Sequence, residues 1–156
     1  MKVSRRHGRL RLQLDPVEIA ILESMFDELA DVAAADGDAD ADPVVQRLYP
    51  AARPDDPEAD ADFRSLTRDS LRSERLERIQ ACAAELEHGG DVDLGEDDVA
   101  DRWIKVLNDL RLALGVRLEI SEDDDPLADL DPTDQPRLIY HWLTAVQDTV
   151  VTALMG

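Results

Sequence analysis

Thiol chemistry in this sequence depends on one residue, Cys82. A cysteine is reactive when it is exposed and when nearby positive charge lowers its pKa. On a helix, Arg78 would lie one turn before Cys82 and favour the thiolate, whereas Glu85 would lie almost one turn after it and oppose the thiolate. Because Cys82 stands between two alanines and free cysteines are among the most buried residues, we favour a packing role and keep a redox thiol as the alternative.

Aspartates and histidines could hold a metal ion or transfer protons. The aspartates in 36–42 alternate as calcium ligands do, but an EF-hand loop needs Gly at its sixth position and Glu at its twelfth, where this sequence has Ala41 and Arg47. The sequence also lacks a phosphate-binding glycine loop, a nucleophile elbow and zinc-ligand spacing. We therefore expect no catalytic residue, no metal site and no cofactor.

The charge of the chain is strongly acidic, with 36 acids, 17 bases and a net charge of −19. Such a chain repels phosphate backbones and anionic lipid surfaces, so we do not expect direct nucleic-acid binding or membrane binding. Residues 1–14 are the exception, because they carry bases such as Arg5 and Arg6 and no acid. We interpret them as a basic tail lying on the acidic body, and the alternative is an arm that contacts nucleic acid or an acidic partner.

The cellular location follows from similar observations. No segment approaches the roughly 18 apolar residues of a membrane span. The basic N-terminus is not followed by the apolar stretch of a signal peptide. A single cysteine cannot form an internal disulfide, which suits a reducing compartment. We therefore expect a cytoplasmic protein.

Residues 103–115 have the most apolar helical pattern in the chain, and we expect the other elements to pack around this helix. One face of this helix carries apolar side chains at helical spacing: Val99, Trp103, Val106, Leu107, Leu110 and Leu114. Leu112 and Ile104 fall on other sides, and a helix that is apolar on more than one side is usually buried on more than one side. We predict that it is the central helix of a single domain spanning 1–156.

Other helices are predicted from their start signals and faces. Asp15, Pro16 and Glu18 are typical of a capped helix start, which predicts a helix over 16–35. A last helix starts near Pro136, and 44–48 forms one helical turn. Between 57 and 88 the apolar face changes sides, so we expect a break near Ser70–Ser73 that gives two helices.

Two segments, 9–14 and 116–120, alternate polar and apolar residues and are predicted to be short strands that pair with each other. This pairing requires Gly115 to end the central helix, which would begin with a capping box at Asp93–Glu96. The expected fold is mainly α, a compact bundle of about five helices with a small two-stranded β pairing. Acidic loops occupy 36–56 and 121–135.

Polar residues on two helices have both a packing and a recognition interpretation. Asn108, Asp109 and Arg111 interrupt the apolar central helix, and salt bridges that fix packing are favoured over a polar recognition surface. The preceding helix carries a run of arginines that is favoured as a salt-bridged solvent face, with docking of an acidic partner as the alternative. The candidates for such docking are Arg68, Arg72 and Arg75.

The order of motifs along the chain resembles the actinobacterial family of formerly unknown function that includes the oxidative stress regulator AosR. Leu48-Tyr49-Pro50 and Asp55–Ala59 come first. The signature residues follow: Trp103, Asn108, Asp109, Arg111, Gly115 and Trp142. The resemblance implies a regulator in which oxidation of a cysteine pair promotes association with an alternative sigma factor. This sequence has Cys82 and no second cysteine, so it can have no intramolecular disulfide switch, and only sulfenylation, a mixed disulfide or a disulfide between chains remains.

Together these observations favour a non-enzymatic regulatory or adaptor protein that acts by protein–protein interaction. The expected partner is a transcription component such as an alternative sigma factor, and the sequence leaves a homodimer open. Two alternatives belong to other classes. One is an enzyme with a site in an acidic cleft, which requires carboxylates with perturbed pKa values. The other is DNA binding through the basic N-terminal arm.

Overall fold

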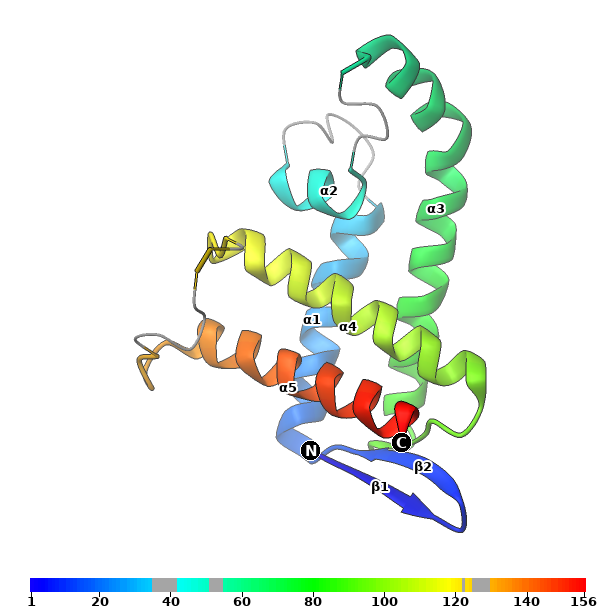
Figure 1. The fold of residues 1–156 in the computed structure, drawn as a ribbon, viewed down its shortest axis with the longest axis vertical. Helices are drawn as coiled ribbons and strands as arrows, with labels where there is room; N and C mark the ends of the chain where they lie inside the picture. The colour runs from blue at the N-terminus through cyan, green and yellow to red at the C-terminus, as the bar shows by residue number, and fades with distance from the viewer. Residues whose placement is uncertain (35–41, 51–54, 122, 125–129) are drawn as a thin grey trace.

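The computed structural model describes residues 1–34, 42–50, 55–121, 123–124 and 130–156, without the side chains of 60–61, 63–66 and 97. In chain order the elements are β1 (Lys2–Arg6), β2 (Arg9–Gln13), α1 (Pro16–Ala34), α2 (Pro43–Leu48), α3 (Pro57–Leu86), β3 (Asp91–Asp93), α4 (Asp97–Arg117) and α5 (Gln135–Met155) (Figure 1). The protein is mainly α-helical with a small sheet, as predicted. Parts of both acidic loops, including most of the aspartates considered as calcium ligands, lie outside the described residues.

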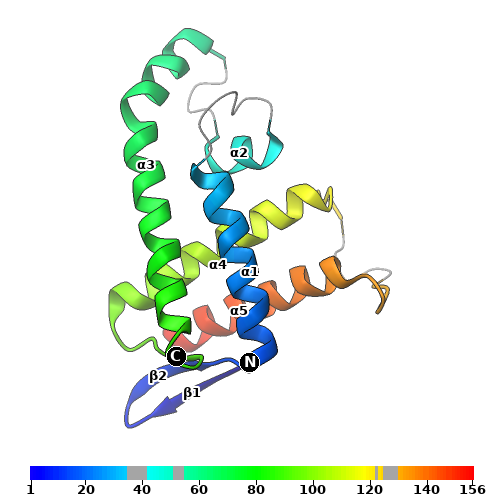
Figure 2. The ribbon, with the colours of Figure 1, turned by 180° about the vertical axis from the view of Figure 1, so that it is seen from behind.

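Helix α4 crosses the middle of the molecule, and α1, α2, α3 and α5 all contact it (Figures 1 and 2). Its predicted face is buried at Val99, Trp103, Val106, Leu107 and Leu110. The ring of Phe26 on α1 packs edge-on against Trp103, with ring centroids 6.0 Å apart. Truncating a core side chain of this size costs about 3 to 5 kcal/mol, so Trp103 is a main anchor of the core. The predicted central helix is confirmed.

Helices α1 and α5 begin close to where their start signals predicted. The Asp15 side chain accepts a hydrogen bond from the backbone N–H of Glu18 at 2.9 Å, and the Glu18 carboxylate accepts one from the N–H of Asp15 at 2.9 Å. This reciprocal capping satisfies two donors at the start of α1. None of the helices in the described ranges is both long and apolar enough to span a membrane.

Helix α3 is one continuous helix of 30 residues, so the predicted break near Ser70–Ser73 is wrong. The prediction assumed that both halves cover the same body. Among the side chains of α3 that the structure describes, the buried ones, such as Ile79 and Leu86, lie in the C-terminal half, while the N-terminal half extends past the end of α1 (Figure 1). Residues 69–71 in the middle of the helix are exposed to solvent. The helix therefore does not have to bend in order to bury them.

The sheet is a three-stranded antiparallel one in the order β1-β2-β3. Strands β1 and β2 form a hairpin in which Arg6 pairs with Arg9 across the two-residue turn His7-Gly8. Both turn residues have positive φ, 51° and 81°, as the hairpin turn that matches strand twist requires. The basic residues interpreted as a tail therefore lie in the two paired strands of a hairpin.

The predicted pairing of 9–14 with 116–120 is wrong, because β2 pairs instead with β3. Helix α4 continues through Gly115 to Arg117, and the following residues form its C-terminal cap. In this cap the N–H of Ile120 donates to the carbonyl of Gly115 at 2.9 Å, and the N–H of Glu119 donates to that of Val116 at 3.1 Å. This is the Schellman arrangement, with Glu119 in the left-handed conformation that glycine usually occupies (φ 56°).

The roles predicted for Gly115 and for Asp93–Glu96 at the two ends of α4 differ from those in the structure. A Cβ on Gly115 would lie 3.4 Å from the ring of Tyr140 on α5, which is an ordinary van der Waals contact. The predicted capping box at Asp93 is wrong, since the N-cap of α4 is Glu96 and makes no side-chain cap bond. Asp93 instead accepts from the N–H of Gly95 at 2.9 Å and helps to hold the hairpin.

Candidate protein-interaction site

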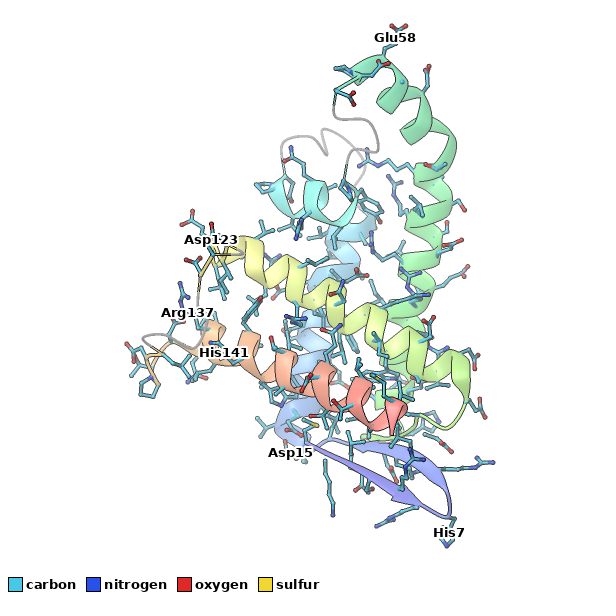
Figure 3. All side chains as sticks on the ribbon, viewed as in Figure 1. His7, Asp15, Glu58, Asp123, Arg137 and His141 are labelled. Atoms are coloured by element: carbon cyan, nitrogen blue, oxygen red, sulfur yellow. The ribbon has the colours of Figure 1, made fainter. Side chains whose placement is uncertain are left out.

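The basic hairpin is held against the acidic body of the protein. Arg11 Nε donates to Asp91 Oδ1 at 2.8 Å, and Arg9 Nη1 donates to Asp93 Oδ2 at 3.1 Å. Arg5 donates to the carbonyl of Ala153 at the end of α5, at 3.1 Å. These contacts agree with the interpretation of a basic segment lying on its own acidic body. Arg6 is exposed beside His7 at the hairpin tip (Figure 3), and recognition by Arg5 or Arg6 remains a prediction.

Cys82 lies in the core on the buried face of α3, with no exposed surface. Burial foremost, and the negative charge of Glu85 next, raise the pKa of its thiol to about 12, while Arg102 and Arg78 act in the opposite direction. At neutral pH the thiol is therefore protonated and shielded from solvent. These properties agree with the packing interpretation.

Arg75 is directed into the protein rather than toward solvent. Its guanidinium donates two hydrogen bonds to Asp109, Nε to Oδ2 at 2.9 Å and Nη2 to Oδ1 at 3.3 Å, and a third to the carbonyl of Leu48 at 3.0 Å. It also stacks over the ring of Tyr49, with 4.6 Å to the ring centroid. A docking role that needs an exposed guanidinium therefore does not fit Arg75.

The other two arginine candidates lie nearer the surface of α3. Arg68 lies over the Tyr49 ring at 6.0 Å, and Arg72 lies 3.8 Å from the carboxylate of Asp69. Both side chains are partly buried. Docking of a partner at Arg68 and Arg72 remains a prediction.

The other signature residues connect the central helix to its neighbours. Arg111 on α4 donates to Thr144 Oγ1 on α5 at 3.1 Å and also bonds Gln147. Trp142 on α5 donates through Nε1 to Glu18 on α1 at 3.3 Å. Asp109 faces α3 instead, while Asn108 is half-buried. Asp109 thus forms a salt bridge that fixes packing, as predicted, whereas Arg111 bonds the neutral side chains of Thr144 and Gln147.

An acidic pocket of about 230 Å³ lies between the end of α3, β3 and the start of α4. Three of its carboxylates are engaged: Asp91 and Asp93 bind the hairpin arginines, and Glu85 binds Arg102 and the Nε1 of Trp103. The pKa of Asp93 is lowered, first by the hydrogen bond from Gly95 and then by Arg9. A general acid working near neutral pH needs a raised pKa instead. Within the described ranges, no three His, Cys, Asp or Glu side chains converge as metal ligands would.

A long apolar groove, which we call the α1 groove, was not predicted from the sequence. It has a volume of about 660 Å³ and lies between α1, the C-terminal end of α4 and the start of α5. These ends extend to one side of α1 in Figure 2. The lining is apolar except for a few residues: Pro16, Val17, Ala20, Ile21, Ser24, Met25, Glu28, Leu29 and Val32 from α1, Leu110, Ala113, Leu114 and Arg117 from α4, and Pro136 and Ile139 from α5.

The rim of the α1 groove is acidic. Helix α1 contains five carboxylate residues and no basic residue. Among them, Asp27 and Asp31 are exposed and lie beside the groove-lining stripe of the helix. The basic residue in the described part of the lining, Arg117, is paired with Glu28 at 2.6 Å, so its charge is directed to Glu28 rather than to Asp27 or Asp31. The groove therefore combines an apolar floor with negative edges.

Comparison with known proteins gives one family and several relatives. The sequence model of a family described as a domain of unknown function, DUF2017, matches residues 1–154. The chain is 30% identical to the oxidative stress regulator AosR of Mycobacterium tuberculosis (strain ATCC 25618 / H37Rv) over 190 residues, which covers 99% of this chain and 87% of the relative. The values for AosR of Mycobacterium bovis (strain ATCC BAA-935 / AF2122/97) are the same. No solved structure matches the chain.

Proposed function

The chain belongs to the DUF2017 family, and we propose that it is a regulatory protein of the oxidative stress response that acts by binding another protein. The observation that carries this proposal is its likeness to AosR, which extends over 99% of the chain rather than over one segment. A likeness of this extent covers the core and the surfaces together. The regulatory role named for these relatives is therefore the best-supported role for this protein.

A binding function is favoured over catalysis by what the two candidate sites contain. In the acidic pocket, Asp91 and Asp93 bind arginines of the hairpin and Glu85 binds Arg102, and the pKa of Asp93 is lowered rather than raised. The α1 groove is mostly apolar, and the two charged residues in its described lining, Glu28 and Arg117, pair with each other. Exposed apolar grooves with polar rims are typical of protein-interaction surfaces.

The oxidation signal does not act through a thiol of this chain. Cys82 has no exposed surface, and the pKa of its thiol is raised to about 12. Since the thiolate is the species that oxidants attack, Cys82 is poorly suited to sensing. We propose that the protein responds to oxidative stress through its partner or through its own abundance.

The partner we propose is a cytoplasmic component of transcription, such as an alternative sigma factor. Direct DNA binding is less favoured, because the net charge is −19 and two of the hairpin arginines, Arg9 and Arg11, are paired with Asp93 and Asp91. Regulation through a protein partner requires no positive surface of this kind.

Partner capture from the native organism tests the proposal. The full chain, tagged and expressed at its native level, is recovered from cells with and without peroxide, beside a Cys82→Ala variant. We expect a transcription component in both captures, at the same ratio for the two proteins. Recovery of no transcription component under either condition would count against the proposed function.

A further inference from the structure

We propose that the α1 groove binds an amphipathic helix of the protein partner, with Lys or Arg flanking the apolar face of that helix. This inference rests on the proposed function, because it names the partner's chemistry and the surface that receives it. The length of the groove, its exposed apolar residues and its charge all fit such a helix.

The groove has the length of several helical turns. Its lining includes every turn of α1 from Pro16 to Val32, which is about 24 Å at 1.5 Å per residue. A docked helix places anchors one or two turns apart on one face, at i, i+3 or i+4, and i+7. The groove can therefore hold three successive anchors, whereas a small ligand would use one part of it.

The floor of the groove exposes large aliphatic side chains. Val17 has 69% of its surface exposed, and Ile21, Met25, Leu114 and Ile139 are only partly buried. Met25 can adapt to different anchors, because methionine is unbranched and flexible. Covering these groups removes apolar surface from water, which is the main driving force for helix-in-groove binding.

The negative charge around the α1 groove favours a positively charged partner helix. Helix α1 has five carboxylate residues and no base, and Asp123 and Asp124 are exposed just beyond the end of α4. Figure 3 shows Asp123 at the end of α4 and Arg137 and His141 at the start of α5. A helix flanked by Lys or Arg complements this rim and associates faster. A second copy of the chain would bring another net charge of −19 to the same surface, so self-association is disfavoured.

A designed peptide tests this chemistry with the full chain. The probe is a fluorescent helix of roughly 18 residues, about 27 Å long, made of Leu at helical spacing and Lys elsewhere. Two control peptides are used: one has the same composition with the Leu positions scrambled, and the other replaces Lys with Glu. Anisotropy titrations should show saturable binding of one amphipathic Leu/Lys peptide per chain, with at least tenfold weaker binding of both controls.

Two matched variants locate the binding. Ser24→Arg places a long side chain on the exposed middle of the groove lining, and Ser70→Arg makes the same change at an exposed position of α3. The two proteins have equal net charge, so general attraction for the peptide is the same. We expect Ser24→Arg to weaken binding at least tenfold and Ser70→Arg to change it by less than twofold. Circular dichroism should show unchanged helix content for both.

Other outcomes overturn the inference. Equal binding of the scrambled peptide would indicate general electrostatic attraction, and equal binding by Ser24→Arg would place the peptide elsewhere. A dimer in sedimentation that Ser24→Arg dissociates would assign the groove to a second copy. The proposed function fails separately: if the wild-type chain captures a transcription component and Ser24→Arg captures it equally, only the groove assignment is wrong.

Discussion

Arg75 on α3 and Asp109 on α4 form a two-bond ion pair, with 2.9 Å between Nε and Oδ2 and 3.3 Å between Nη2 and Oδ1. Among the described residues, Asp109 is the one fully buried charged side chain. Burial alone would lower the pKa of Arg75, but the Asp109 carboxylate holds that pKa above its ordinary value. Because the same guanidinium bonds the carbonyl of Leu48, it connects α2, α3 and α4.

Replacing Asp109 with Ala should lower the free energy of unfolding by about 3 to 5 kcal/mol, because it leaves the guanidinium of Arg75 buried without its counter-charge. Urea unfolding followed by circular dichroism measures this change. On the same helix, Lys105→Ala removes a pair with Asp101 in which both side chains are more than half exposed (54% and 61%). That control should cost less than about 1 kcal/mol. Equal losses of unfolding free energy for the two variants would show that the buried pair contributes no more to stability than the exposed pair.

Cys82 should be almost unreactive in the folded protein. A rise in its pKa from 9.0 to about 12 lowers the thiolate fraction at neutral pH by about a thousandfold, and burial blocks access as well. Labelling with a chromogenic disulfide reagent should proceed rapidly in urea and at least a thousandfold more slowly in buffer. Rapid labelling of the folded chain would instead support an oxidation response through the Cys82 thiol.

Stability should decrease at alkaline pH through Cys82. Since the folded-state pKa lies above the unfolded value, the unfolded chain releases this proton from pH 9 upward while the folded chain keeps it up to about pH 12. The contribution is fully present below pH 9 and is lost as the pH rises toward 12. Between pH 8 and pH 10 the wild type should lose about 1 kcal/mol more than Cys82→Ala. Parallel urea curves for the two proteins at both pH values would contradict this assignment.

Glu119→Gly should stabilise the protein by about 1 kcal/mol, because Glu119 holds φ at 56° in the cap of α4, where glycine carries little strain. Thermal unfolding of the full chain measures the gain. Glu119→Gln removes the charge from the negative end of the helix but keeps the Cβ, so it separates the two effects. If the Gln variant matches the Gly variant, charge rather than backbone strain is the cause.

The sequence predicted structure well where neighbouring residues decide it. The start of α1 follows from Asp15 and Glu18, which bond each other's backbone across one turn. The apolar residues around Trp103 predicted the central helix, because they cover more than one side of that helix and must be buried on those sides. Both signals are local, and distant contacts reinforce them.

The sheet could not be predicted in the same way. The alternation of polar and apolar residues at 116–120 also fits the last turn of a helix and its cap. In the structure this segment is the end of α4 and its cap. Strand β3 has only three residues, too few for a period-two pattern. One signal was present: Asp93 lies opposite Arg11 in the observed register, so the opposite charges of these two segments could have suggested that they pair.

The α1 groove was missed for a different reason. Helix α1 has a second apolar stripe, including Val17, Ile21 and Met25, beside the stripe that faces the core. A sequence shows such a stripe but not whether another element covers it. In this protein the answer depends on where α4 ends and α5 begins, which is a tertiary property.

The central claim is a regulatory role in oxidative stress that requires a protein partner and not Cys82. The most direct measurement is the peroxide-induced transcript response of a strain that lacks the gene, complemented with the wild type or with Cys82→Ala at equal protein levels. We expect the deletion to alter the response and both proteins to restore it equally. An unaltered response in the deletion strain would contradict the regulatory role, and failure of Cys82→Ala alone would contradict a mechanism that is independent of the thiol.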